Sequence, residues 1–291
     1  MHRCAFLTMA DPTGFVIDDD LAVAPLAALG WHVDRVPWNS SADWDTYDLV
    51  IIRSPWDYQH HAEAFLAVLA EIEASSARLE NPLPLVRWNL EKGYLRDLDA
   101  RGLAIVPTAW SQGLDTNLGG ALDGYFDTFG TDQLIVKPTV SANADDTFWL
   151  TAPLDAATRT MLAEMFADRA CMVQPFVPAV LSEGEFSLFY FAGAYSHTIL
   201  KTPKPKDFRV QEEHGGLIRA IRPEPALRAR ADAVMATLTP APLYARVDFV
   251  RMPEGTFAVM EVELIEPALY LRMDADAPER FAHAVDAWMS G

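Results

Sequence analysis

Two patterns of apolar and polar positions alternate in the first third of the chain. Apolar runs and helical spacings predict, in order, strand 3–9, helix 20–29, strand 31–36, strand 49–52 and helix 61–75. The run at 49–52 is apolar throughout, which is typical of a parallel strand buried on both faces. This order predicts an α/β domain whose ligand-binding loops follow the carboxyl ends of the strands.

The remainder of the chain follows a different pattern, with more strands. A helix is predicted over 89–100 after a break at Asn81-Pro82-Leu83-Pro84, and the polar, glycine-rich segment 111–124 is interpreted as a connection. Further strands are predicted at 134–138, 148–150, 171–175, 185–191 and 195–201, a hairpin at 244–263, and helices at 154–168, 225–238 and 277–289. Long antiparallel strands dominate from residue 184, so an α+β architecture is expected to follow the α/β domain.

The position of the turn in the hairpin 244–263 predicts which residues of its two strands lie opposite one another. A two-residue turn centred on Glu254-Gly255 places a glycine where such turns require a positive φ. This turn pairs Asp248 with Glu261. The same register pairs Arg246 with Glu263, and because side chains alternate between faces, all four share one face. The other face, expected to pack into the core, carries Val247, Phe249, Met260 and Val262.

The paired carboxylates predict a metal site. Like charges directly opposite one another destabilise a sheet, so a cation is expected between Asp248 and Glu261. Glu263 lies two residues further along the same face and adds a third carboxylate. Hard oxygen donors in this arrangement suit Mg²⁺, which also binds phosphates. The alternative is the solvent-exposed polar face of an amphipathic hairpin, which the opposed acids disfavour.

Composition limits the class of protein. The 291 residues include 23 Lys and Arg against 41 Asp and Glu, a net charge of −18, so nucleic acid and anionic membranes are not expected partners. No apolar run approaches the roughly 20 residues of a membrane helix, and no signal-peptide pattern opens the chain. Cys4 and Cys171 form no disulfide or zinc pattern, so a cytoplasmic protein is expected.

Two of the five lysines predict an anionic ligand. Lys137 and Lys201 each end an apolar strand, where an ammonium group needs water or an anion. Either lysine alone is typical of a surface strand end, but together with the carboxylates they predict a polyphosphate ligand. The sequence contains no G-x-x-x-x-G-K-[ST] or G-x-G-x-x-G motif, which disfavours P-loop and dinucleotide sites.

Short motifs extend this set in a fixed order along residues 88–267. They are Asn89-Leu90-Glu91-Lys92, Val136-Lys137-Pro138, Val173-Gln174-Pro175-Phe176-Val177, Glu183-Gly184-Glu185-Phe186, Arg246-Val247-Asp248 and Glu261-Val262-Glu263. In this order they resemble the ATP-grasp superfamily, which includes D-Ala–D-Ala ligases and bacterial glutathione synthetases and binds ATP between two α+β subdomains. The sequence departs from the family in three places: Glu263 replaces the usual Asn, the loop 139–147 lacks the usual glycines, and the segment 264–267 after Glu263 is longer than the usual spacer.

The resemblance implies an ATP-grasp fold of mixed α/β and α+β class. Residues 1–88 would form an N-terminal α/β substrate-side domain with a parallel sheet. Residues 104–176 would form a small central lid subdomain. Residues 89–103 and 177–291 would form the C-terminal catalytic subdomain with an antiparallel sheet.

The resemblance also implies roles for individual residues. ATP contacts are implied for Lys92, Lys137, Ser141, Gln174, Phe176, Val177 and Glu185, the last on the ribose. Two Mg²⁺ ions are implied for Asp248, Glu261 and Glu263. Stabilisation of the phosphoryl group during transfer is implied for Arg246, Arg209 and Lys201.

A narrower similarity concerns four further segments. They are Arg53-Ser54-Pro55-Trp56-Asp57-Tyr58, Ser196-His197, the stretch from Lys201 through Lys206-Asp207-Phe208-Arg209-Val210-Gln211, and Leu264-Ile265-Glu266-Pro267. They look like the cyclo-ligase subgroup of cycloserine biosynthesis, which closes O-ureido-D-serine. Substrate contacts are then implied for Arg53, Ser54, Trp56, Asp57 and His197. A proline turn with a capping Asp is an equal interpretation of the first segment, and a hydrogen-bonded structural histidine is the commoner role for His197.

The function implied is an ATP- and Mg²⁺-dependent carboxylate–amine ligase, or an intramolecular cyclo-ligase, acting on an amino-acid-like substrate. Such an enzyme forms an acyl phosphate, then a C–N bond, and releases ADP and phosphate. Two alternatives stay open: a catalytically inactive ATP-binding protein with a regulatory or scaffold role, and an ATP-grasp kinase. ATP-grasp ligases are often dimers, so the resemblance also allows a homodimer.

Overall fold

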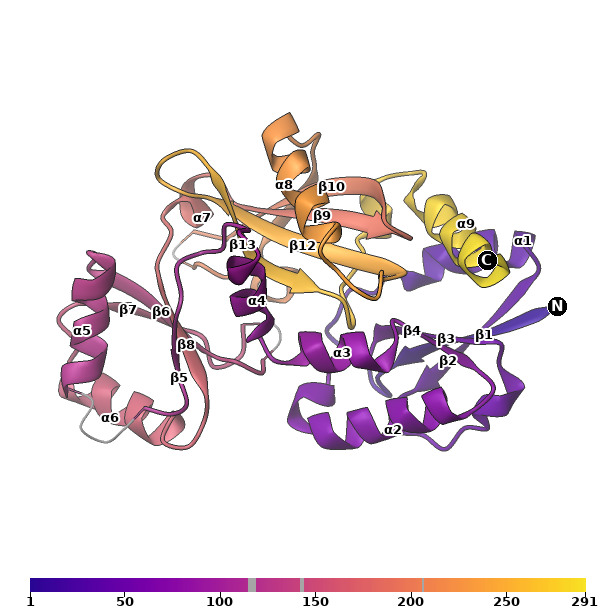
Figure 1. The fold of residues 1–291 in the computed structure, drawn as a ribbon, viewed down its shortest axis with the longest axis horizontal. Coiled ribbons are helices and arrows are strands. Elements are labelled where there is room, and N and C mark those ends of the chain that lie inside the picture. Colours follow the sequence, from indigo (N-terminus) through magenta and orange to yellow (C-terminus); the bar gives the residue numbers. More distant parts are fainter. Residues whose placement is uncertain (115–118, 142–143, 206) are drawn as a thin grey trace.

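The computed structural model describes residues 1–114, 119–141, 144–205 and 207–291. Over these residues the strands form three sheets, built from residues 2–80, 109–175 and 185–263. Figure 1 shows the first sheet at one end of the molecule, the second at the other end, and the third between them. Each predicted domain therefore contains one sheet. None of the described helices is long and apolar enough to cross a membrane.

The N-terminal sheet is parallel, as predicted. Its strands lie in the order β2-β1-β3-β4, with bounds β1 (His2–Thr8), β2 (Trp31–Pro37), β3 (Leu49–Ser54) and β4 (Arg78–Glu80). Every residue of β3 is buried, because helices cover both faces of the sheet. Leu49 and Ile51 pack with α1 (Val23–Ala28) and α9 (Ala277–Ser290), while Val50 and Ile52 pack with α2 (Ala62–Ala74). The C-terminal helix thus completes the core of the N-terminal domain.

The middle sheet is antiparallel, in the order β5-β8-β6-β7. Its strands are β5 (Ala109–Ser111), β6 (Gln133–Pro138), β7 (Phe148–Thr151) and β8 (Cys171–Pro175), and its helices are α5 (Gly119–Phe129) and α6 (Ala156–Met165). The interpretation of 111–124 as a connection is wrong, because α5 begins within it. Leu122 and Phe126, one helical turn apart, are buried in the core of this sheet and hold α5 there. Residues 115–118 lie outside the described part.

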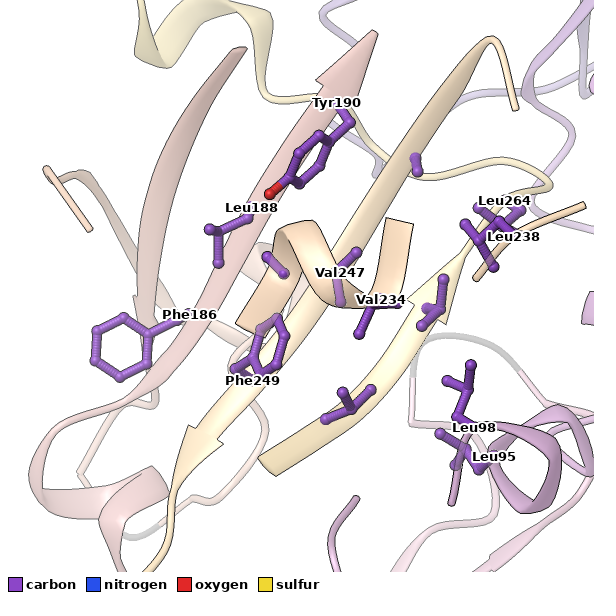
Figure 2. Packing of buried hydrophobic residues seen from close by; sticks show 14 of the residues in the cluster. Leu95, Leu98, Phe186, Leu188, Tyr190, Val234, Leu238, Val247, Phe249 and Leu264 are labelled. Carbon is purple, nitrogen blue, oxygen red and sulfur yellow. The ribbon is translucent and has the colours of Figure 1, made fainter. Parts of the chain in front are cut away.

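The third sheet is antiparallel, in the order β11-β10-β9-β12-β13. Its strands are β9 (Glu185–Phe191), β10 (Ala194–Thr202), β11 (Leu217–Ala220), β12 (Tyr244–Arg251) and β13 (Phe257–Glu263). Helices α4 (Tyr94–Ala100) and α8 (Pro225–Met235) pack on one face. Figure 2 shows this packing: Val234 lies beside Val247, while Leu95 and Leu98 belong to the same cluster further from Phe249. The opposite face packs in part against the N-terminal domain and α9, through Phe189, Phe191 and Tyr244, and the rest of it carries polar side chains toward a cavity.

The helix predicted over 89–100 is two helices, α3 (Leu83–Leu90) and α4, separated at residues 91–93. The prolines interpreted as a break instead begin α3, since the first helical turn tolerates proline. The interruption has a structural role, because the backbone N–H of Lys92 donates to the carbonyl of Thr139 at 2.8 Å. Lys92 is thereby held against the loop that follows β6. The remaining helix, α7 (Ala179–Ser182), is short, and 3₁₀ turns occur at Asp19–Ala22, Trp44–Thr46, Tyr58–His60, Glu212–His214 and Leu271–Met273.

The predicted register of the β12–β13 hairpin is confirmed, since Asp248 pairs with Glu261 and Arg246 with Glu263. The two-residue turn expected at its end is wrong. Three residues, 253–255, lie between Met252 and its partner Thr256, and Gly255 takes the positive φ of +87°.

A β-bulge at Met260 reconciles the longer turn with the predicted register. Phe249 pairs with Val259, so Met260 is the extra residue between two regular stretches. The bulge changes the side of the sheet on which Met260 lies. Instead of joining Val247 and Val262 in the core, it lines the cavity described below.

Candidate active site

A cavity collects side chains from all three sheet regions, among them Trp56, Lys137 and Asp248. Every residue predicted for ATP, metal or phosphoryl transfer lines it: Lys92, Lys137, Ser141, Gln174, Phe176, Val177, Glu185, Lys201, Arg209, Arg246, Asp248, Glu261 and Glu263. Trp56, a predicted substrate contact, lines it as well. Residues far apart in sequence are thus brought to one place.

Glu261 lies where two lysines meet. Lys137 Nζ is 2.9 Å from Glu261 Oε1, and Lys92 Nζ is 3.6 Å from the same oxygen. Lys92 Nζ also donates to the carbonyl oxygen of Ser141 at 2.9 Å. Burial alone would raise the pKa of Glu261, but the two ammonium groups outweigh it and hold the pKa well below its usual range. Glu261 is therefore ionised, and two cations gather beside it.

Lys201 is a buried cation shared by two acids. It is directly opposite Glu185 across strands β10 and β9 and pairs with that carboxylate. Its Nζ is also 3.4 Å from Asp248 Oδ2. Burial opposes the charged form, but Asp248 and Glu185 together raise the pKa of Lys201 above its ordinary value. Burial raises the pKa of Glu185 to about 7, even with the Lys201 charge beside it.

Arg246 lies between the two remaining acids. Its Nη2 donates to Asp248 Oδ2 at 3.0 Å and pairs with Glu263. Burial works against ionisation of Asp248, but Arg246 and Lys201 lower its pKa overall. Burial raises the pKa of Glu263, the charges of Asp248 and Glu261 add to the rise, and Arg246 opposes it. The three carboxylates are thus close enough to influence one another.

The predicted metal ligands contact cations of the chain itself. Across the part of the chain that the structure describes, no group of three His, Cys, Asp or Glu side chains is arranged around a single metal position. Asp248, Glu261 and Glu263 nevertheless offer only hard carboxylate oxygens to one cavity, which is the donor chemistry that Mg²⁺ prefers. The donor set fits the ion, and the metal site stays a prediction.

Another part of the cavity wall is apolar. Val106, Val177, Val180 and Val210 form one buried cluster and line the cavity. Phe176 beside them stacks on Trp149, with ring centroids 4.4 Å apart. A wall that is apolar in one part and rich in lysine in another suits a ligand with a flat ring at one end and phosphates at the other.

Comparison with known proteins agrees with this geometry. The family model for the N-terminal domain of D-cycloserine synthetase DcsG matches residues 4–81. Over 292 aligned residues, 95% of this chain and 96% of the relative, the sequence is 32% identical to cycloserine biosynthesis protein DcsG of Streptomyces lavendulae. The chain belongs to the DcsG family.

Solved structures place the family in a wider fold. The crystal structure of D-cycloserine synthetase DcsG has a TM-score of 0.88 and 28% identity to this chain, over 99% of both. D-alanine–D-alanine ligase from Bacillus anthracis, solved with ATP, has a TM-score of 0.69 and 15% identity, covering 100% of this chain and 98% of that one. The ATP-grasp ligase PsnB, solved with a minimal precursor, Mg and ADP, has a TM-score of 0.66 and 15% identity, over 99% and 98%. The predicted ATP-grasp fold and the predicted class, an ATP-dependent ligase, are confirmed.

Four residues predicted for substrate binding do not line the cavity of this DcsG-family ligase: Arg53, Ser54, Asp57 and His197. Arg53 is fully buried, with Nε donating to Asp19 at 3.0 Å and Nη2 donating to the carbonyl of Pro267 at 2.8 Å. Ser54 is also fully buried, and Asp57 accepts a hydrogen bond from Trp38 Nε1 at 2.7 Å. Arg53 lies in strand β3 and not in the predicted loop, and its guanidinium forms hydrogen bonds inside the protein. Lys206 and residues 142–143, which belong to two of the segments singled out in the sequence, lie outside the described residues.

His197 has the structural role that was the alternative for it. It lies away from the cavity, stacked on Phe189 with ring centroids 4.3 Å apart. Its Nε2 is 3.0 Å from the carbonyl oxygen of Leu269, and its Nδ1 is 2.9 Å from Ser196 Oγ. Burial lowers the pKa of His197 to about 4, although the bond to Leu269 works against the shift. The neutral ring is what the fold accommodates.

This burial predicts acid sensitivity. The unfolded chain binds a proton at His197 near pH 6.5 and the native chain only near pH 4, so stability should fall as pH decreases between these values. The slope from this one group approaches about 1.4 kcal/mol per pH unit. Urea unfolding of wild type and His197→Gln at pH 7, 6 and 5 measures it. The variant should lose less stability on acidification; parallel curves would contradict the prediction.

Tyr58 and Glu266 are two of the cavity residues that were not among the predicted substrate contacts. Tyr58 and Glu266 both line the cavity, and burial raises the pKa of both side chains. Each lies in a segment that carried the narrower similarity, 53–58 and 264–267. A carboxylate placed three residues beyond the metal-ligand motif was the available signal.

Proposed function

We propose that this DcsG-family protein is an ATP- and Mg²⁺-dependent ligase that forms a C–N bond on an amino-acid-like substrate through an acyl phosphate. The observation that supports this most directly is the arrangement of charge in one cavity. Lys92 and Lys137 meet at Glu261, while Lys201 and Arg246 meet at Asp248. Lysine and arginine held this way offer a polyphosphate several cationic contacts at fixed positions.

Asp248, Glu261 and Glu263 are the residues that would hold Mg²⁺, two ions in our proposal. When bound, the metal would neutralise phosphate charge. Lys137 and Lys92 would contact the phosphates, and the three acids, now paired with these lysines and with Arg246, would supply carboxylate oxygens to the metal. The apolar wall around Phe176 and Val177 takes the adenine, and Glu185 takes the ribose hydroxyls.

Chemistry follows from positions and charges. A substrate carboxylate oxygen attacks the γ-phosphorus, and the bond between that phosphorus and the ADP oxygen breaks. Arg246 and Arg209 face this region and stabilise the negative charge on the phosphoryl group in transit. An amine nitrogen, from a second molecule or from the same one, then attacks the acyl carbon, loses its proton and displaces phosphate. Family membership favours the intramolecular, ring-closing version, since the relative is a D-cycloserine synthetase.

No covalent enzyme intermediate is part of the proposal. Cys171 is fully buried outside the cavity, and burial raises the pKa of its thiol to about 11, so it is not a nucleophile near neutral pH. Ser54 also lies off the cavity, which leaves the substrate carboxylate as the acceptor of the phosphoryl group.

The test is ADP release with ATP and Mg²⁺ across O-ureido-D-serine and a panel of D- and L-amino acids, with product mass measured in parallel. The expected result is ADP formation together with a product lighter than its precursors by the elements of water; for O-ureido-D-serine, a product lighter by a further HNCO would show that the carbamoyl group is also removed by hydrolysis, which releases CO₂ and ammonia. ADP without a condensed product would indicate a kinase. ATP binding with no ADP from any compound would overturn the ligase proposal in favour of a regulatory protein.

A further inference from the structure

We propose that Glu266 binds the protonated amino group of the substrate, and that the loop 53–58 is the element that positions Glu266 for this. The inference rests on the proposed function, because it assigns one end of the substrate within the same cavity. It gives the loop a role that its own side chains, mostly turned away from the cavity, do not fulfil directly.

Glu266 is the acid whose charge the cavity leaves unmatched. The other buried or half-buried acids lining it are each held in ion pairs: Glu185, Asp248, Glu261 and Glu263. Within the described chain Glu266 takes part in no ion pair: the charge of Lys92 lowers its pKa, but the Lys92 ammonium is paired with Glu261. Glu213 also lacks such a pair, but it is exposed and water can solvate it. A half-buried carboxylate with no cation indicates that a cation comes with the ligand.

The backbone around Glu266 is fixed on every side. Trp56 Nε1 donates to the Glu266 carbonyl at 2.9 Å, and Arg53 Nη2 donates to the Pro267 carbonyl at 2.8 Å. On the preceding side, the Tyr244 hydroxyl donates to the Ile265 carbonyl at 2.8 Å. Successive carbonyls of the segment 264–267 are thus held by side chains from other elements.

The side chain of Glu266 is fixed as well. Tyr58 lines the cavity beside it, and the Tyr58 hydroxyl lies near enough to the Glu266 carboxyl to lower the pKa of that carboxyl, against the effect of burial. Arg53, Trp56 and Tyr58 therefore all lie against the segment 264–267, from the end of β3 to the start of the 3₁₀ turn Tyr58–His60. Arg53 is in turn anchored on Asp19 and is 1% exposed. A side chain supported by such a shell keeps one orientation toward the ligand, which is the requirement for selecting a functional group.

The charge distribution gives the substrate an orientation. Lysines gather where phosphates and the reacting carboxylate belong, so the carboxylate end of an amino acid lies toward Glu261 and Lys137. Glu266 lines the same cavity beside Trp56 and Tyr58, where an ammonium group can reach it. Burial and the charge of Glu263 raise the pKa of Glu266 to about 8, and an ammonium beside it would favour the ionised carboxylate. A substrate with an uncharged group in place of the ammonium would gain no such electrostatic attraction to Glu266.

Paired ligands test the assignment without turnover. Glycerate differs from serine by a hydroxyl in place of the amino group, so binding of both enantiomers of each is measured by calorimetry with Mg²⁺ and a non-hydrolysable ATP analogue. Wild type should bind one serine enantiomer at least about 30-fold more tightly than the matching glycerate. Glu266→Gln should weaken serine binding about 50-fold and glycerate binding less than about threefold. The exposed turn residue Glu254 gives the control, Glu254→Gln, which should change neither.

Kinetics then separate binding from a proton-transfer role. With a substrate identified by ADP release, Glu266→Gln should raise the KM for that substrate and leave the KM for ATP within about twofold. Equal binding of serine and glycerate by wild type, or a loss confined to kcat, would overturn the assignment. Because the calorimetry needs no turnover, an inactive wild type would refute the proposed function while the serine and glycerate comparison still decides the role of Glu266.

The positioning role of the loop has its own test. Trp56→Phe removes the donor to the Glu266 carbonyl, so the substrate KM should rise about fivefold with kcat and the KM for ATP unchanged. Trp288→Phe is the matched control, since Trp288 Nε1 also donates one hydrogen bond, in its case to the carboxylate of Glu80 at 2.7 Å, away from the cavity. An unchanged substrate KM in Trp56→Phe, or the same rise in Trp288→Phe, would refute positioning by the loop.

Discussion

Replacing Glu261 with glutamine should abolish Mg²⁺-dependent turnover, a loss of at least about 10³-fold, while the fold stays intact. Glu261 is the point at which Lys137 and Lys92 converge, and it is a proposed metal ligand. Glutamine keeps the shape and one oxygen but removes the charge that draws both the metal and the lysines. The two ammonium groups would then repel each other and lose the position from which they contact phosphates.

The measurement is ADP release over a range of Mg²⁺ concentrations, with far-UV circular dichroism to verify folding. Glu254→Gln makes the same chemical change on the same hairpin, but Glu254 is exposed in the turn and should be silent. Activity equal to that of the wild type at every Mg²⁺ concentration would show that Glu261 is not a ligand. Rescue at high Mg²⁺ would instead show that it contributes affinity and not an indispensable contact.

The site could be predicted from sequence where chemistry follows a local rule. Strand alternation is enough to place Asp248 opposite Glu261, because side-chain period and turn position fix the face. The same rule placed Met260 on the wrong face, because a β-bulge shifts the alternation of side chains. The bulge depends on the packing of the whole strand, and no residue type near Met260 indicates it. The helix α5 was missed for a related reason: glycines argued for a connection, and only burial of Leu122 and Phe126 overrides them.

Long-range contacts limited the prediction of substrate residues. Arg53 and Glu266 both lie in segments that carry the narrower similarity, yet nothing local tells which of the two faces the ligand. The fold decides it, because Asp19 and the Pro267 carbonyl bind the guanidinium of Arg53, whereas Glu266 lines the cavity and forms no ion pair with a residue of the described chain. Likewise, His197 lies on the same strand as Lys201, but its ring is turned onto Phe189. A single sequence does not show which residues far apart along the chain are in contact in the fold.

Lys201→Met should lower the free energy of unfolding by about 3 kcal/mol near pH 8, the largest effect on stability of the single changes considered. Lys201 is 3% exposed, directly opposite Glu185, and 3.4 Å from Asp248. Removing the ammonium leaves two buried carboxylates side by side. Asp248 still has Arg246, so Glu185 bears most of the cost. Urea unfolding followed by fluorescence measures the free energy of unfolding.

The pH dependence of this loss has a definite sign. The pKa of Glu185 is already raised to about 7 in the wild type, above its unfolded value, and loss of Lys201 would raise it further. A carboxyl whose folded pKa is raised destabilises the native state above the unfolded pKa, and the penalty grows as pH rises toward the folded pKa. The gap between wild type and Lys201→Met should therefore be small at pH 5 and large at pH 8.

A double variant identifies the acid responsible. Adding Glu185→Gln to Lys201→Met removes the unpaired charge, so it should restore about half of the lost stability at pH 8 and flatten the pH dependence. If the double variant is no more stable than Lys201→Met, the penalty comes from lost packing of the lysine stem or from Asp248. If Lys201→Met is as stable as the wild type, the fold does not depend on the charge of Lys201. The buried lysine would then be retained for binding its ligand.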